Sequence, residues 1–374
     1  MRPIHSGKLE RFLGTEKVEE ISRNMRGWYG PPIAVAGVPG NVWAQRDGDF
    51  AGRLNCGSFL TGLDFAVDRL RRYVKRVARH AVRRQFAQLN AGFASISDMI
   101  SEATAGSKMR RFDFMKIGAT GVVGGTNTLW RVTGGTPAGG AAGSAAPGGR
   151  VPDDTVTGAF PFSNPAGGDT QHLVSSYILG SQVSTILLYD RLFDVAKTMS
   201  SSATEAVTGV PNRYTNTTAG TIDSCEGNFL FIEIFAALSA TAHNWTVCQY
   251  SNQAGTGPQS LPSVTGNSSG IIDRLDQPTF TWFCPLVAGD TGVQKLTQMQ
   301  NSSAAVTGSI NFCIGHPLAW MPVPIINMVC ERSHVATAFN LVRIFDNACL
   351  AFLEVIKSVT TATNYTGSFL TLAG

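Results

Sequence analysis

A change of pattern near residue 92 divides this 374-residue chain and limits what it can fold into. Beyond that point, from "FDFMKIGATG" onward, short apolar runs alternate with clusters of Gly, Ser, Thr and Asn. Such a pattern is typical of many short strands joined by turns. We therefore predict a mainly β body at 96–374, built as one or two β-sandwich units of jelly-roll type.

The region before this change predicts helix instead. Residues 63–90 contain neither Gly nor Pro, which permits one long helix. We predict an N-terminal arm at 1–61 and a basic amphipathic helix within 62–95. A second, shorter helix is expected over "ASISDMISEATAG", with Ser95 or Ser97 as its N-cap.

The most basic stretch of the chain is "VDRLRRYVKRVARHAVRR", which holds eight Lys or Arg at 67–84. Its apolar residues follow a heptad spacing, and a stripe of Arg follows the same spacing two residues out of phase. Two residues correspond to about 200° of helical rotation, so the stripe lies opposite the apolar seam. We predict an assembly helix, whose interaction residues are Val67, Leu70, Val74 and Val77 in the seam, and Arg69, Arg72, Arg76, Arg79 and Arg83 in the stripe.

Three interpretations of the Arg stripe stay open: a solvated helix face, a contact with an acidic neighbouring subunit, and a contact with nucleic acid. Residues 1–95 hold sixteen Lys and Arg against eight Asp and Glu, whereas the rest of the chain holds fourteen against eighteen. A basic appendage on a slightly acidic body favours assembly with further copies of the chain. Contact with packaged DNA is the alternative, because backbone binding needs only such a stripe.

The body contains an apparent internal repeat, at about 184–250 and 310–372. Three ordered segment matches support it, and two related halves of a sandwich would explain them. The matched positions include Glu233 with Glu354, and Arg213 with Arg343. The last segment predicts a hairpin, in which "AFLEVIKSV" and "YTGSFLTL" pair across a turn at "TATN".

Catalytic motifs are weak. Ser268 is the centre of "GNSSG", which matches the G-x-S-x-G nucleophile elbow, but that elbow needs a strand before it and a helix after it. Here "SLPSVT" predicts a loop, and "IIDRLDQPTFTWF" predicts a strand. The histidines lack metal-ligand spacing, and phosphate-binding Gly motifs are absent. We therefore predict no catalytic residues, no metal, no cofactor and no enzymatic activity.

Other features of the sequence are less specific. The seven Cys are scattered without a CxxC motif, which favours free buried thiols, with a disulfide between neighbouring subunits as the alternative. The low-complexity stretch "GGTPAGGAAGSAAPGG" at 134–149 predicts an exposed loop or linker. The first residues lack the apolar core of a signal peptide, and the apolar runs are too short to span a membrane. We therefore expect no membrane contact.

Several stretches resemble tailed-bacteriophage virion proteins of the capsid-associated kind. They are "LYDRLFDVA", "VPNRYT", "PLVAGDTGVQKL", "HPLAWMPV" and "ERSHVATAFNLVRIFDNACLAFLEV". The resemblance covers roughly 96–374 and leaves out 1–95, which looks like an added module. It implies a structural, non-enzymatic role in a particle.

The expected function is that of a virion structural protein that decorates or cements a bacteriophage capsid or its neck. It would be located in the virion, as a homo-oligomer in contact with other capsid or neck proteins. The nearest alternative is the major capsid (shell) protein, with the basic helix as its spine. Alternatives of another class are a tail-associated hydrolase and a nucleic-acid-binding protein.

Overall fold

A computed structural model describes residues 93, 95–105, 108–118, 120–262, 264–335, 341–355 and 357–374. The chain divides into two compact units, Met1–Val77 and Ala78–Gly374, and all described residues belong to the second. The predicted arm at 1–61 and almost all of the predicted basic helix therefore lie outside the described residues.

One helix, α4 (Ile96–Thr104), opens the described part. Its N-cap is Ser95, whose hydroxyl accepts a hydrogen bond from the Asp98 backbone N–H at 3.0 Å. Such a cap satisfies one of the N–H groups that lack a partner in the first helical turn. The helix is the short one expected from the sequence, and its buried Met99 packs with Phe93 and Leu372.

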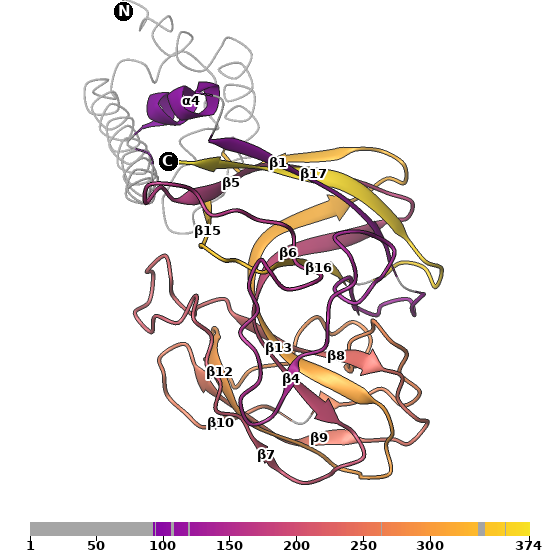
Figure 1. Cartoon of the computed structure of the whole chain (residues 1–374). Helices are drawn as coiled ribbons and strands as arrows, with labels where there is room; N and C mark the ends of the chain where they lie inside the picture. Colours follow the sequence, from indigo (N-terminus) through magenta and orange to yellow (C-terminus); the bar gives the residue numbers. More distant parts are fainter. Residues whose placement is uncertain are drawn as a thin grey trace, which may run out of the picture. The chain divides into compact units, whose positions relative to one another are not determined.

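Apart from this helix the described residues form strands and loops, so the prediction of a mainly β body is confirmed (Figure 1). The strands make three sheets. Sheet A has the order β14 (Cys330–Ser333), β5 (Gln171–Gly180), β17 (Asn364–Ala373), β1 (Met109–Ile117) and β3 (Gly135–Thr136), with β15 (Val342–Ile344) also on β5. Sheet B has the order β2 (Asn127–Thr128), β16 (Leu350–Val355), β6 (Ser184–Thr198), β13 (Ser309–Val323) and β8 (Phe229–Ala236), with β4 (Ser144–Ala145) also on β6. Sheet C has the order β10 (Gln259–Ser260), β9 (Asn244–Asn252), β12 (Val293–Asn301) and β7 (Glu205–Ala206), with β11 (Val264–Thr265) also on β9.

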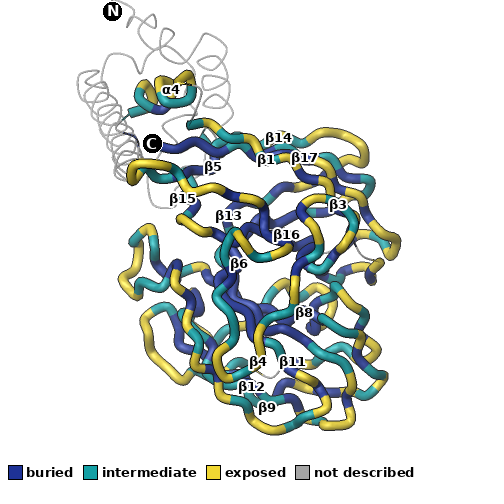
Figure 2. The backbone as a smooth tube through the Cα atoms, in the orientation of Figure 1, coloured by how far each residue is buried: buried dark blue, intermediate teal, exposed yellow. Residues whose placement is uncertain are grey.

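Sheet B is the centre of this unit. Its two middle strands, β6 and β13, are each 15 residues long and pair antiparallel over their whole length. Both are buried on both faces along most of their length, and their sequences accordingly show no strict alternation of apolar and polar residues. Figure 2 shows this buried band running through the middle of the described part.

One face of sheet B, called here the front face, packs against both other sheets. At one end Phe352 of β16 meets Phe114 of β1 in sheet A, with ring centroids 4.6 Å apart. At the other end Phe312 of β13 meets Trp245 of β9 in sheet C at 4.7 Å. All four rings belong to one hydrophobic cluster. Two layered packings therefore share a single sheet, with sheet A and sheet C at opposite ends of β6 and β13 in Figure 1.

Loops cover the opposite, back face. Trp130 and Leu275 pack there with Leu187 and Tyr189 of β6 in a second cluster. The segment at 134–149, expected to be an exposed loop or linker, is held against this face by β4, which pairs parallel with β6. Its backbone wraps closely around Trp130, since a Cβ on Gly140 would lie 2.1 Å from the indole ring. Gly is therefore needed for contact there, and not for flexibility.

Two sequence predictions about strands are wrong. The predicted terminal hairpin does not form, because β16 pairs with β6 in sheet B while β17 pairs with β5 and β1 in sheet A. The apolar run before the turn is buried on both faces and takes a position inside sheet B. The predicted strand "IIDRLDQPTFTWF" is a back-face loop, which pairs with the sheet edges through isolated bridges at Arg274 and Leu275.

Two sets of four strands follow the same order of pairing: β5, β6, β8, β9 and β12, β13, β16, β17. The pair β5 with β17 corresponds to β12 with β9, and the pair β6 with β16 corresponds to β13 with β8. This order follows the predicted repeat at 184–250 and 310–372, whose duplication stays a prediction.

The side-chain matches within that repeat do not hold. Glu233 lies between Ile232 and Ile234, which point to the front face, so its carboxylate points to the back. Glu354 lies between Leu353 and Val355, which point to the back, so its carboxylate points to the front.

The matched arginines differ as well. Arg213 is buried and paired with Asp190, whereas Arg343 lies on β15 with its guanidinium over the Phe345 ring. The predicted repeat therefore aligned residues of the same type that do not lie on the same face of their strands.

Candidate functional site

The interaction residues predicted from the sequence cannot be placed on this fold. Val67, Leu70, Val74, Val77, Arg69, Arg72, Arg76, Arg79 and Arg83 all lie outside the described residues. The candidate sites among the described residues all lie in the body.

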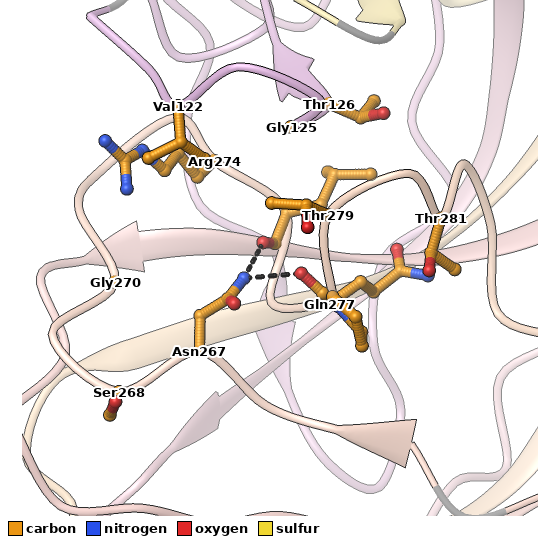
Figure 3. Close-up of a pocket in the computed structure, with 12 residues that line it drawn as sticks. Val122, Gly125, Thr126, Asn267, Ser268, Gly270, Arg274, Gln277, Thr279 and Thr281 are labelled. Atoms are coloured by element: carbon orange, nitrogen blue, oxygen red, sulfur yellow. Dashed lines mark hydrogen bonds between the residues drawn. The ribbon is translucent and has the colours of Figure 1, made fainter. Parts of the chain in front are cut away.

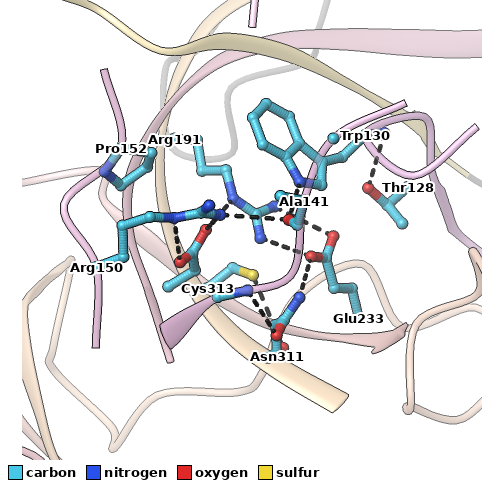
Figure 4. A network of polar contacts seen from close by, with 12 residues as sticks. Thr128, Trp130, Ala141, Arg150, Pro152, Arg191, Glu233, Asn311 and Cys313 are labelled. Atoms are coloured by element: carbon cyan, nitrogen blue, oxygen red, sulfur yellow. Dashed lines mark hydrogen bonds and ion pairs between the residues drawn. The ribbon is translucent and has the colours of Figure 1, made fainter. Parts of the chain in front are cut away.

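A buried charge network occupies the back face of sheet B (Figure 4). Arg191 donates to both oxygens of Glu233, at 2.5 and 3.1 Å, and to Asp194 at 2.8 Å. Arg150 donates to Asp194 at 2.7 and 3.0 Å, and the Asn311 amide donates to Glu233 at 2.8 Å. Two guanidiniums thus balance two carboxylates, and every carboxylate oxygen has a donor. Charges satisfied in this way organise a core and leave little capacity for a ligand.

A second buried pair connects two of the motifs that carried the family resemblance. Arg213 of "VPNRYT" donates twice to Asp190 of "LYDRLFDVA", each time at 2.8 Å. The neighbouring Tyr214 ring stacks on His316 of "HPLAWMPV", with centroids 3.7 Å apart. Burial lowers the pKa of His316 to about 3, so the imidazole is neutral there. These motifs therefore build the fold around sheet B.

A third polar group lies where the front face of sheet B meets sheet A. Glu354 accepts from the Tyr365 hydroxyl at 2.5 Å and from the Asn127 amide at 2.9 Å. The Lys357 ammonium lies 3.3 and 3.4 Å from the two carboxylate oxygens of Glu354, and 3.2 Å from the Thr363 hydroxyl. This group brings an amine, a carboxylate and a carboxamide together in the interior, where Glu354, Lys357 and Asn127 are almost completely shielded from solvent.

A cavity of about 210 Å³ lies beside Ser268 (Figure 3). Gln277 lines it, is 4% exposed, and leaves both atoms of its carboxamide without a partner. Arg274 lines it too, and burial lowers the pKa of its guanidinium. The amide of Asn267 fixes the loop by donating to the Leu275 and Gln277 carbonyls, both at 2.7 Å. The cavity is therefore polar and suited to a small hydrogen-bonding ligand.

Ser268 lacks the surroundings of a nucleophile elbow. "GNSSG" follows the two-residue strand β11 and leads into a loop, not into a helix. The acid–base pair behind it is His243 with Asp276, at 2.9 Å. Asp276 also accepts from the indole of Trp245, and the other imidazole nitrogen lies 3.4 Å from the Thr241 carbonyl. The imidazole is thus engaged in the core, and no hydrogen bond joins it to Ser268 in the part of the chain described.

No metal site emerges either. Among the described residues, no group of three or more His, Cys, Asp and Glu is arranged to hold a metal ion. Six of the Cys are described and are free thiols, five of them buried. The helix in the described region is too short to cross a membrane.

Apolar side chains gather on the surface beside sheet B. Trp282 and Trp320 lie 5.4 Å apart and, with Val183, line a groove of about 300 Å³. The tip between β13 and β14 is tied to this region by Asn327, whose N–H donates to the Gly180 carbonyl at 2.9 Å. We call the following exposed residues, which are 37–68% exposed, the apolar surface: Val122, Val123, Val183, Phe280, Trp282, Ile325, Ile326, Met328 and Val329.

Comparison with known proteins assigns no family. No family model matches the chain, and no curated protein matches it. Among solved structures, it is similar to the crystal structure of the infectious bursal disease virus VP2 subviral particle, at 9% identity, over 71% of this chain and 80% of that chain. The TM-score of this match is 0.14, which is too low to support an argument about fold or function.

Sequence reasoning missed the group around Glu354. The only local signal is "LEVIK", where a Glu in an apolar run precedes a Lys by three positions. Asn127 lies 227 positions away from Glu354 and stands in no motif. Only the pairing of β2 with β16, which places Asn127 directly opposite Glu354, brings them together.

Proposed function

We propose that this chain is a non-enzymatic structural protein of a virus particle, which decorates or cements a capsid or its neck. The observation that carries the proposal is the apolar surface. Exposed apolar side chains on a folded protein mark interaction sites where they gather, and the groove in this surface is lined by two neighbouring tryptophans, Trp282 and Trp320. The buried polar groups support the same role, because their charges pair with one another inside the protein and leave few charged groups to act on a substrate.

The proposed occupant of the apolar surface is a second copy of this chain. Closed assemblies of identical subunits are the commonest oligomers, and a repeated contact is what a particle requires. The exposed apolar residues in the turn at 325–329 and the tryptophan-lined groove supply apolar side chains and a hollow to receive such side chains. A copy of the chain therefore offers both halves of such a contact.

Sedimentation of the full chain tests this proposal. Phe280→Ser combined with Ile326→Ser should shift the oligomer toward monomer while the circular dichroism spectrum stays unchanged. Ile222→Ser, at a residue 42% exposed in the loop between β7 and β8, is the matched control and should leave assembly intact. A folded double variant that assembles like the wild type contradicts the proposed role of the apolar surface.

The basic stretch at 67–84 is proposed as a second assembly contact. Its Arg stripe requires counter-charges, which the slightly acidic body of a neighbouring copy supplies. Arg72→Glu with Arg79→Glu should weaken assembly and reduce its salt dependence. If the same variant instead loses binding to random-sequence DNA and assembles normally, the stripe is a nucleic-acid contact.

The proposal also predicts that Ser268 has no catalytic role. Ser268→Ala should leave fold and assembly unchanged. Turnover of a small acyl ester by the wild type that disappears in Ser268→Ala would establish the hydrolase alternative instead.

A further inference from the structure

The group around Glu354 has the composition of a reaction centre, although its partners all belong to the same chain. One carboxylate oxygen, Oε2 of Glu354, lies 2.9 Å from the Asn127 amide nitrogen and 3.3 Å from the Lys357 amine nitrogen. A carboxylate held between an amine and a carboxamide is placed to take a proton from one nitrogen and give it to the other.

We propose that Lys357 and Asn127 form an intramolecular amide bond with release of ammonia, and that Glu354 transfers the protons. This activity is independent of the assembly role proposed above. It makes Asn127 and Lys357 a modification site of the chain, with Glu354 as the general acid and base.

The reaction balances without an external reagent. The Lys357 ammonium gives a proton to Glu354, and the neutral amine attacks Cγ of Asn127, whose C=O electron pair moves to Oδ1. The tetrahedral intermediate collapses as the C–Nδ2 bond breaks. Nδ2 collects the protons from the amine and from Glu354, so an ammonium ion leaves and Glu354 is a carboxylate again. One C–N bond forms and one breaks, with no change in oxidation state.

Close approach of the two reacting side chains is visible at Gly121. A Cβ on this residue would lie 2.8 Å from Cδ of Lys357 and 3.0 Å from Nδ2 of Asn127. The lysine stem and the asparagine amide therefore pass over the same glycine. Such positioning replaces an encounter between two molecules and is a large source of rate enhancement.

The Asn127 amide is also held in a way that permits attack. Its nitrogen is fixed on Glu354, while its carbonyl oxygen is buried and has no hydrogen-bond partner. Turning the amide plane toward the amine therefore breaks no bond to the oxygen. Burial of the group excludes water, which would otherwise compete for the carbonyl carbon.

Two other buried lysines of the body lack this arrangement. Lys197 pairs with Glu205, and Lys116 donates to the Val132 and Ala138 carbonyls, both at 3.3 Å. In the described structure Glu205, the partner of Lys197, accepts no hydrogen bond from a side-chain carboxamide, whereas Glu354 accepts one from Asn127. Lys197 therefore serves as a control lysine, since it is buried and paired with a glutamate that holds no carboxamide.

Mass spectrometry of the full-length chain tests the proposal. The wild type should be lighter than its sequence mass by one ammonia, and digestion should yield a branched peptide that joins the Asn127 and Lys357 segments. Lys357→Arg and Glu354→Gln should show their full masses. Lys197→Arg should still lose one ammonia, and Asn127→Asp should lose water instead, because an acid then takes the place of the amide.

The mass and the peptides of the wild-type chain test the proposed amide bond even if a variant folds poorly. A wild-type chain with its full sequence mass and two unlinked peptides overturns the proposal. A branched peptide that persists in Glu354→Gln overturns the role given to Glu354.

Discussion

The two ends of sheet B each contain a buried glutamate on a strand that flanks the central pair, and the two differ in what holds them. Glu233, at the end that packs on sheet C, is clamped by Arg191, a guanidinium that stays charged and is a poor nucleophile. Glu354, at the end that packs on sheet A, holds Lys357 and the Asn127 amide. Two buried glutamates on opposite faces of one sheet thus carry different chemistry, since arginine fixes a carboxylate while lysine can react beside one.

The largest expected effect is at the sheet A end. Glu354→Gln should lower the free energy of unfolding by about 5 kcal/mol, because it removes the cross-link, which closes a loop of more than a hundred residues, and leaves Lys357 without its counter-charge. Urea unfolding measures this loss. A change below 1 kcal/mol would show that the carboxylate is neither a catalyst nor a needed partner.

At the sheet C end, Arg191→Met should cost about 4 kcal/mol. The substitution leaves Glu233 and Asp194 buried with too few positive partners, and breaking a buried pair from one side is strongly destabilising. The mass of this variant should still show the loss of one ammonia. If the variant folds but lacks that loss, the two ends are coupled and the comparison fails.

Lowering the pH should destabilise the end of sheet B that packs on sheet A before the other end. Burial lowers the pKa of His172 and His334 to about 4, below the value of about 6.5 in an unfolded chain. The unfolded chain therefore binds more protons between pH 4 and pH 6.5, and stability falls as the pH falls through that window. Burial raises the pKa of Asp273 to about 6, which opposes this trend, so these three groups together lower stability by about 2 kcal/mol from pH 7 to pH 5. His316 in sheet B, whose pKa burial lowers to about 3, adds to the loss in the same direction.

The sheet C end should respond in the opposite sense. Although burial disfavours the charged imidazole, the hydrogen bond that His243 donates to Asp276 raises the pKa of His243, so its contribution persists in acid and is lost as the pH rises. The protection of backbone amides against hydrogen exchange, relative to the intrinsic rate at each pH, should therefore fall at pH 5 in β5 and β14 before β9. An equal loss of protection at both ends, or no reduction of the effect in His172→Gln, would contradict this assignment.

The smallest effect concerns the hydroxyl that completes the Glu354 group. Tyr365→Phe removes one hydrogen bond to the carboxylate and should cost about 1 kcal/mol, while the ring keeps its packing. Thermal unfolding measures this change. The branched peptide should still form, and its absence would mean that the hydroxyl is part of the proton transfer.

The β class of the body followed from its sequence, and so did the short helix capped by Ser95, because both depend on local patterns. The sheet that each strand joins did not follow from the sequence. The runs before and after "TATN" have the composition of hairpin partners, yet β16 and β17 belong to different sheets. That choice depends on which long strands are already present as neighbours, and this information is spread over the whole chain.

The buried polar groups were equally beyond sequence reasoning. Asp190, Arg191 and Asp194 stand in a run that predicts a strand, but their partners come from far away in the chain: Arg150 and Arg213 from loops, and Glu233 from β8. The alignment of Glu233 with Glu354 matched residue types and missed a shift of one position, which moves a side chain to the other face of a strand.

A crystal structure of the full-length chain tests the difference between the two glutamate groups most directly. We predict continuous electron density between Nζ of Lys357 and Cγ of Asn127, at the amide bond length of about 1.33 Å, and no covalent link around Arg191 and Glu233. Two separate side chains at Asn127 and Lys357, with the amide nitrogen still on Glu354, would contradict the account.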